Sequence, residues 1–334
     1  MSLNRSELPS WAHQLRLPML GSPMFILSSK ELVAEQCRAG IVGVLPALNA
    51  RPAEELDNWL AYLDEQRAEW DANPAKPWAC APYAVNLMTH PSNGRLDVDL
   101  ATIVKHRVPI VVTSLSQPAR VVEAVHEYGG MVLHDVSSLR FAHKAIEAGV
   151  DGLILVCAGA GGHTGQLNPF AFVAEVRKFF RGPLALAGGI SNGRQLLATR
   201  IMGADFGYVG TRFIATPESN AAATYKNMVL ESDIDDIVCS NAVTGLYANY
   251  LAKSFEALGI DPRQLEVRSK SSFNLGSDAA SGEVKAWRDI WSAGHGVGAS
   301  QAIEPARLIV DRMAREYEEA LSALLPACGA ASPA

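Results

Sequence analysis

Short apolar runs alternate with amphipathic segments of helical length over the first two-thirds of the chain. The runs Leu153–Cys157, Pro183–Ala187 and Phe206–Val209 each lead into a glycine-containing loop. Between them lie two segments with a helical pattern, Pro169–Phe180 and Asn192–Met202. Runs this short and this uniformly apolar are typical of strands buried on both faces of a parallel sheet. The repeat predicts an α/β fold whose functional residues follow the carboxyl ends of the strands.

The same strand and helix unit recurs from the start of the chain. The runs that we expect as strands are Leu17–Met24, Ile41–Leu45, Ala79–Leu87, Pro109–Thr113, Met131–Asp135, Gly152–Cys157, Pro183–Ala187 and Phe206–Val209. The earlier helices are expected over Lys30–Arg38, Pro52–Trp70, Val98–His106, Pro118–Tyr128 and Ser138–Ala148. Eight such units in roughly 200 residues predict a (β/α)8 TIM barrel. An open doubly wound sheet would normally carry a dinucleotide-binding glycine fingerprint after its first strand, and none stands there.

The pattern changes after Thr216. We expect helices over Glu218–Glu231 and Ala248–Leu258, a polar loop over Pro262–Gly282, a short element over Gly282–Trp291 and a long amphipathic helix over Pro305–Leu325. The predicted organisation is a barrel over 1–216, a helical cap inserted after the eighth strand over 217–303, a helix over 304–325 that packs back on the barrel, and a flexible tail over 326–334.

Composition narrows the class of protein. The chain has 334 residues, 49% of them hydrophobic, and a net charge of −6, which is unlike the basic face of a nucleic-acid-binding protein. Its five cysteines form no CxxC pair, so reduced thiols are expected rather than disulfides or a metal site. There is no signal-peptide core and no apolar stretch of membrane-spanning length. We expect a cytoplasmic enzyme, and apolar positions on the cap helices leave a homodimer open.

Two glycine loops follow the last two predicted strands. The backbone N–H groups of Gly188–Asn192 and Gly210–Arg212 could converge on one anion, as they do where barrels of this type hold a phosphate. The loop after the sixth strand places His163 among several glycines. The alternative is that these loops are tight turns that close a barrel. Cys157 lies at the same edge, but a buried cysteine is commonly inert.

Four motifs together carry a family resemblance. They are GAGGHTG (Gly159–Gly165), AGGIS (Ala187–Ser191), GADFGYVGTRFIATPES (Gly203–Ser219) and WSAGHGVG (Trp291–Gly298). These residues resemble the nitronate monooxygenases, formerly called 2-nitropropane dioxygenases, and the resemblance runs from Pro18 to about Gly298. GTRFxxTxES combined with the glycine-histidine loop is specific, whereas AGGI alone occurs in many phosphate-binding barrels.

The resemblance implies an oxidoreductase that binds FMN and oxidises alkyl nitronates or nitroalkanes with O2 through a flavin semiquinone. From the charge, the cysteine spacing and the apolar pattern described above, we expect no metal and no nucleic-acid or membrane partner. His163 matches the active-site histidine of the family. The positions that the resemblance assigns to FMN are Gly188, Gly189, Gly210 and Thr211 at the phosphate, Met24, Phe25 and Asn86 at the ring, and also His134, Gly161 and Ala187.

Two residues depart from the family pattern. Many relatives carry a lysine after the histidine of the fifth strand, where this chain has His134 and Asp135. A cation there would help to stabilise negative charge on a flavin. His295 stands where glutamine is expected. Both departures bear on the substrate more than on the cofactor.

The chemistry expected of His163 depends on its protonation. An imidazole with an ordinary pKa of about 6.5 can accept a proton from the carbon beside a nitro group, or stay protonated and hold the anion. The alternative role is structural, as a hydrogen bond to a neighbouring carbonyl. Two rival functions remain open: an FMN-dependent NAD(P)H reductase of the enoyl-acyl-carrier-protein or quinone type, and a flavin-free barrel that binds a phosphorylated metabolite.

Overall fold

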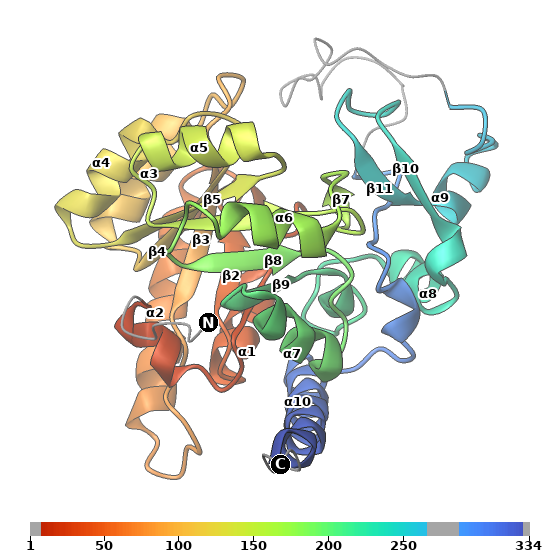
Figure 1. The fold of residues 1–334 in the computed structure, drawn as a ribbon. Helices are drawn as coiled ribbons and strands as arrows, with labels where there is room; N and C mark the ends of the chain where they lie inside the picture. The colour runs from red at the N-terminus through yellow and green to blue at the C-terminus, as the bar shows by residue number, and fades with distance from the viewer. Residues whose placement is uncertain (1–7, 266–286, 330–334) are drawn as a thin grey trace.

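The computed structural model describes residues 8–265 and 287–329 of the chain. Its main feature is an eight-stranded parallel sheet that curls into a nearly closed, TIM-barrel-like barrel (Figure 1). In order around the barrel the strands are β1 (Met19–Gly21), β9 (Phe206–Val209), β8 (Leu184–Ala187), β6 (Gly152–Val156), β5 (Met131–Val136), β4 (Ile110–Ser114), β3 (Tyr83–Met88) and β2 (Gly43–Pro46). A parallel bridge between Leu20 and Val42 brings β1 beside β2, and the Gly21 N–H donates to the Val42 carbonyl at 2.8 Å.

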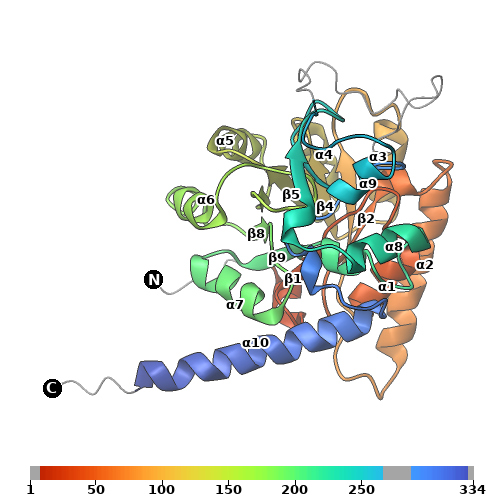
Figure 2. The same ribbon diagram turned by 90° about the vertical axis from the view of Figure 1, so that its right-hand side faces the viewer.

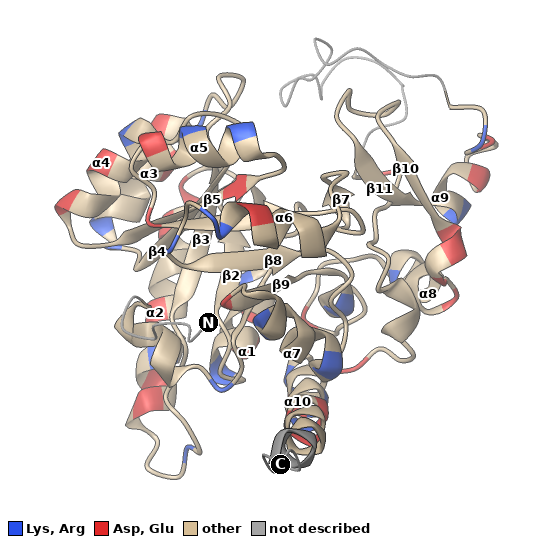
Figure 3. Ribbon diagram, viewed as in Figure 1, with Lys and Arg blue, Asp and Glu red and all other residues tan. Residues whose placement is uncertain are grey.

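Helices surround the barrel on its outside. They are α1 (Lys30–Arg38), α2 (Glu55–Ala72), α3 (Leu96–Lys105), α4 (Ala119–Glu127), α5 (Leu139–Glu147), α6 (Pro169–Val176) and α7 (Gly193–Met202). The long α10 (Ala306–Gly329) runs past α7 and α1 (Figure 2). Short 3-10 helices are η2 (Ser10–Gln14), η3 (Ala47–Asn49), η4 (Thr211–Phe213), η5 (Ile234–Asp236) and η7 (Val297–Ala299). Basic and acidic residues are interspersed over the outer helices (Figure 3).

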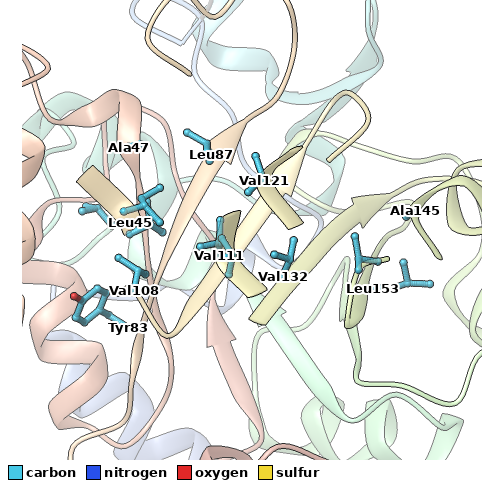
Figure 4. Close-up of a cluster of buried hydrophobic side chains, with 14 of the residues drawn as sticks. Leu45, Ala47, Tyr83, Leu87, Val108, Val111, Val121, Val132, Ala145 and Leu153 are labelled. Atoms are coloured by element: carbon cyan, nitrogen blue, oxygen red, sulfur yellow. The ribbon is translucent and has the colours of Figure 1, made fainter. Parts of the chain in front are cut away.

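The core has two layers because every barrel strand is buried on both faces. Outward-facing residues such as Val111, Val132 and Leu153 pack against Val121 and Ala145 of the helices (Figure 4). The inward-facing positions form a second cluster that fills the barrel, which includes Leu20, Val44, Ala84, Val112, Leu133, Ile154, Ala185 and Phe206. Side chains alternate between the two faces along a strand, so the inner row ends in the residues that form the floor of the barrel mouth.

Local sequence signals start and stop these helices. Ser29, Ser138 and Asn192 each accept a hydrogen bond from a backbone N–H in the first turn of α1, α5 and α7, as expected of N-cap residues. α7 ends at Gly203 with φ 109°, a left-handed conformation that favours glycine. All eight predicted strands are confirmed, with small shifts at their ends.

The segment after the barrel differs from the purely helical one that the sequence predicted. Ala248–Leu258 was expected as one helix, but β11 (Ala248–Leu251) precedes the short α9 (Ala252–Glu256). β11 pairs antiparallel with β10 (Ile237–Ser240) and with β7 (Gly162–His163), so the strand pairs of a small sheet replace the first part of that helix. α8 (Ala223–Leu230) is shorter than the helix predicted over Glu218–Glu231.

The domain boundaries predicted at 216 and 304 stay a prediction. Most of the expected loop Pro262–Gly282, half of the element Gly282–Trp291 and residues 330–334 of the expected tail lie outside the described residues. α10 continues past its predicted end at Leu325 to Gly329.

A buried ion pair ties the segment that leads into α10 to the barrel. Arg212, in η4, lies 3.6 Å from Glu304 and donates to Ser300 Oγ at 3.1 Å, with the Arg212 side chain 4% exposed. Glu304 also pairs with Arg312 of α10. We expect Arg212→Met to lower the free energy of unfolding by about 3 kcal/mol, because the Glu304 carboxylate loses one of its two arginine partners in a buried setting. Urea denaturation measures this, with Arg181→Met, at an exposed arginine, as the control. Equal losses in the two variants would contradict a special role for the pair.

Candidate active site

A cavity of about 1040 Å³ opens at the carboxyl ends of the barrel strands. The strand ends and their loops line it from the barrel side, and β7, residues 243–247 and residues 292–296 contribute from beyond the barrel. The structure brings together every residue that the sequence placed in the site: Met24, Phe25, Asn86, His134, Gly161, His163, Ala187, Gly188, Gly189, Gly210 and Thr211.

The glycine loops after β8 and β9 offer unpartnered donors to this cavity. Within the described residues, the backbone N–H groups of Gly189, Gly210 and Thr211 donate no hydrogen bond. Gly188 and Gly189 have φ angles of 131° and 73°, and a Cβ on Gly189 would meet nothing within 4 Å. Buried N–H groups normally have a partner. Free donors beside open space therefore form a cradle that fits an anion such as a phosphate.

The motifs that are distant in sequence are hydrogen bonded to one another at this edge. The Gly294 N–H donates to Thr211 Oγ1 at 2.9 Å, and the His295 N–H donates to the Gly159 carbonyl at 3.0 Å. A Cβ on Gly161 would lie 2.8 Å from the Gly294 nitrogen, so glycine is required there. His295 packs its ring on Gly159, within 3.1 Å of where a Cβ would stand, and is not among the described residues that line the cavity.

His163 enters the cavity from the side opposite the barrel. It belongs to β7, pairs with Ala248 of β11, and stacks edge-on against Trp287 at 5.2 Å between ring centroids. Its Nε2 lies 3.2 Å from Thr244 Oγ1. Because the Thr244 hydroxyl itself donates to the Leu246 carbonyl at 3.2 Å, we assign the proton to Nε2 and the lone pair to Nδ1.

The protonation state of His163 follows from its surroundings. Desolvation lowers its pKa to about 4, so the imidazole is neutral at pH 7. A neutral ring can accept a proton, whereas the alternative expectation of a permanently protonated ring does not fit this environment. The hydrogen bond between His163 Nε2 and the Thr244 hydroxyl also fixes the orientation of the ring.

The floor of the cavity consists of inward-facing strand ends. Asn86 donates to the Val112 carbonyl at 3.2 Å and reaches Ser114 Oγ at 3.4 Å. Asp135, two residues after the inward-facing Leu133, also lines the cavity. Burial raises the pKa of the Asp135 carboxyl to about 7. In the sequence Asp135 was noted only as a departure from the family pattern, and its place in the floor was not predicted.

His134 lies on the other face of β5. It is buried, and its Nδ1 is 2.8 Å from Thr113 Oγ1 of the neighbouring strand β4. Burial lowers its pKa to about 4, so it is neutral. The Thr113 hydroxyl also lies 3.2 Å from the Leu133 carbonyl. When it donates there, Nδ1–H donates to Thr113 and Nε2 is left as an acceptor.

Sequence reasoning missed Phe141 and Lys144 of α5, which are exposed at the edge of the cavity. They carry no local motif, and only the fold brings them to the site. Tyr247 and Trp287, two of the aromatic residues after the barrel from which the sequence expected one or two to cover the substrate pocket, do line the cavity. Cys157 does not line the cavity among the described residues, and burial raises the pKa of its thiol to about 12, so it is an unreactive thiol.

No three His, Cys, Asp or Glu side chains within the described ranges gather as a metal site would require. Nor does the described part of the chain contain a helix that is both long and apolar enough to span a bilayer.

The fold and the cavity define the class: a TIM-barrel-like α/β protein with a cavity at the carboxyl ends of its barrel strands. Residues 10–314 match the family model described as "Nitronate monooxygenase". The chain therefore belongs to the nitronate monooxygenase family, whose members are typically flavin-dependent oxidoreductases.

Individual relatives are distant. The chain is 26% identical to a nitronate monooxygenase of Paraburkholderia phytofirmans, over 92% of this chain and 94% of that protein. It is 25% identical to an indene-carboxyl-CoA dehydrogenase of Mycobacterium tuberculosis, over 69% of this chain and 61% of that protein. Among solved structures, a nitroalkane oxidase from Streptomyces ansochromogenes superimposes with a TM-score of 0.75 at 23% identity, covering 94% of this chain and all of that one. FabK from Thermotoga maritima gives 0.74 at 24% identity, covering 93% and 96%. These two similarities concern the fold alone.

Proposed function

We propose that this chain is an FMN-dependent nitronate monooxygenase that oxidises alkyl nitronates and nitroalkanes with O2. One observation carries the proposal: the unpartnered N–H cradle after β8 and β9 and the neutral imidazole of His163 line the same cavity from different sides. The cradle is suited to a phosphate, and the imidazole is suited to a carbon acid. FMN supplies the one-electron chemistry when it is bound.

The residues of the chain have separate tasks in this proposal. The N–H groups of Gly188, Gly189, Gly210 and Thr211 hold the phosphate of the cofactor without needing a cationic side chain. Met24, Phe25, Asn86, Gly161 and Ala187 line the space for the ring, with the His134 side chain at its edge.

His163 acts on the substrate. Its Nδ1 accepts the proton from the carbon beside the nitro group of a neutral nitroalkane, and the resulting imidazolium lies next to the nitronate anion that forms. The fixed hydrogen bond from Nε2 to Thr244 holds the ring in one orientation for this transfer. A substrate that is already a nitronate does not require this step.

The second candidate is an NAD(P)H-dependent flavin reductase that acts on a larger substrate such as an enoyl thioester or a quinone. The size of the cavity favours it, because about 1040 Å³ is at the upper end of ordinary ligand pockets. The exposed Phe141 and Lys144 at the edge could contact a long substrate that carries an acidic group.

Anaerobic mixing separates the candidates. We expect the purified protein to bind FMN, and the bound flavin to lose its visible absorbance when ethyl nitronate or propyl-2-nitronate is added but not when NADH or NADPH is added. Aerobic turnover of the nitronates with O2 consumption should follow. Rapid bleaching by a nicotinamide, with none by a nitronate, would reject the proposal in favour of the reductase. A colourless protein that does not bind added FMN would reject both.

A further inference from the structure

Asp135 is the one carboxylate among the described residues that line the cavity. It follows the inward-facing Leu133 on β5, and alternation along the strand places it in the inner row, at the top of the barrel interior. Its Oδ1 is covered by protein and accepts no hydrogen bond in the described part of the chain. An ionised oxygen in that position is costly.

No cationic side chain within residues 8–265 and 287–329 offsets the negative charge of the Asp135 carboxylate. Burial alone raises its pKa to about 7, with no compensating cation, so both protonation states are populated near neutral pH. Across the floor, burial raises the pKa of the Tyr208 phenol of β9, and the nearby charge of Asp135 raises it further. The other titratable side chains that line the cavity are His134, Lys144, His163, Tyr225 and Tyr247.

Asp135 and His163 occupy different sides of the cavity. Asp135 belongs to the strand ends of the barrel, whereas His163 belongs to β7, which pairs with β11 outside the barrel. A flat cofactor whose phosphate occupies the cradle after β8 and β9 would lie over the strand ends. The floor carboxyl then acts on the cofactor, and the imidazole acts on the substrate.

We propose that Asp135 is a positioning residue of the flavin site whose carboxylate takes up a proton when the bound FMN is reduced, and that it thereby sets the reduction potential of the cofactor. This inference rests on the proposed flavin site. The electrons come from a nitronate substrate, or from dithionite in the test. The proton comes from solvent and binds a carboxylate oxygen of Asp135, and no bond to the flavin forms. Added negative charge above the floor favours the protonated acid because like charges repel.

Proton uptake by Asp135 makes the midpoint potential of the bound FMN fall more steeply with pH above about pH 7. Below about pH 7 Asp135 is already protonated, so reduction draws in no additional proton there. Above that pH the ionised carboxylate takes up one proton on reduction, until the pH exceeds its higher pKa in the reduced protein. One additional proton per two electrons steepens the fall of the midpoint potential by about 30 mV per pH unit.

The experiment compares FMN-loaded wild type with Asp135→Asn and Asp135→Glu by spectroelectrochemical titration from pH 6 to pH 9. Asp97→Asn, at an exposed carboxylate of α3, is the charge-matched control. We expect Asp135→Asn to raise the potential above pH 7 and to remove the additional slope, and Asp135→Glu and Asp97→Asn to retain it. Reduced-minus-oxidised infrared spectra at pH 8 should show a carboxylic acid band in wild type that is absent from Asp135→Asn.

Each outcome decides the inference. Equal slopes in FMN-loaded wild type and Asp135→Asn would overturn the role of Asp135 and leave the flavin site intact. Failure of the wild type to bind FMN would overturn both proposals. If Asp135→Asn does not fold, the wild-type infrared spectrum decides: a carboxylic acid band gained on reduction supports the inference, and its absence at pH 8 overturns it.

Discussion

Replacing His163 by asparagine is expected to lower kcat/KM for neutral nitroalkanes by roughly 10²- to 10⁴-fold, the range that a positioned general base contributes. Asparagine removes the lone pair on Nδ1 and keeps a polar side chain of similar reach. The backbone pairing of His163 with Ala248 does not depend on the side chain, and the cradle for the phosphate lies on the other side of the cavity. FMN content should therefore stay full, as judged from the flavin-to-protein absorbance ratio.

A comparison of two substrates, a nitroalkane and its preformed nitronate, tests whether His163 acts as the base. A preformed nitronate has already lost the proton, so its kcat/KM should fall much less in His163→Asn than that of the parent nitroalkane. His143→Asn changes an exposed histidine of α5 that stacks on Phe179 and does not line the cavity, and it should leave both rates unchanged. Equal losses for nitroalkane and nitronate would show that His163 does not act as the base. Unchanged rates for both would leave it the structural role.

The barrel could be predicted from the sequence because its strands are short apolar runs with one period throughout. Because the strands are buried on both faces, nearly every position in them is apolar. The glycine loops mark where the strands end. The cradle could be predicted for a related reason. Gly188 and Gly189 have positive φ angles. Because glycine is favoured at such angles, the two glycines mark this loop in the sequence without any knowledge of a ligand.

The small sheet beyond the barrel could not be predicted in the same way. β7 is only Gly162–His163, too short to show any alternation. Ala248–Leu251 continues into α9 without a turn residue, so the joint segment has the spacing of a single helix. Its first part is extended because β10 and β7 pair with it on either side, a tertiary effect that overrides local propensity.

Asp135 illustrates how a site residue can be overlooked although the signal is present. Its position two residues after Leu133 fixes its face of the strand, and counting along β5 would have placed it inside the barrel mouth. The adjacent His134 was singled out for its chemistry, but it faces the other way and bonds Thr113. It still reaches the cavity because the site extends over the strand ends toward α5.

Substituting valine at Gly189 is expected to weaken FMN binding by roughly 100-fold. A Cβ there meets no protein atom within 4 Å, so the added side chain projects into the open space that the phosphate needs. Losing one or two hydrogen bonds to a charged group costs about 1.5–3 kcal/mol each, and each 1.4 kcal/mol is tenfold in affinity. Titration of the apoprotein with FMN, followed by flavin fluorescence, measures the dissociation constant.

Backbone strain must be separated from loss of the cradle in this variant. Gly259 offers a matched control, because its φ of 72° is within one degree of the 73° of Gly189 and a Cβ there also meets nothing within 4 Å. It is exposed beyond α9 and does not line the cavity. Valine in a left-handed conformation costs about 1–2 kcal/mol at either site, so both variants should lose similar thermal stability while Gly259→Val retains normal FMN affinity. If both variants bind FMN as tightly as the wild type, the phosphate does not occupy the cradle after β8 and β9.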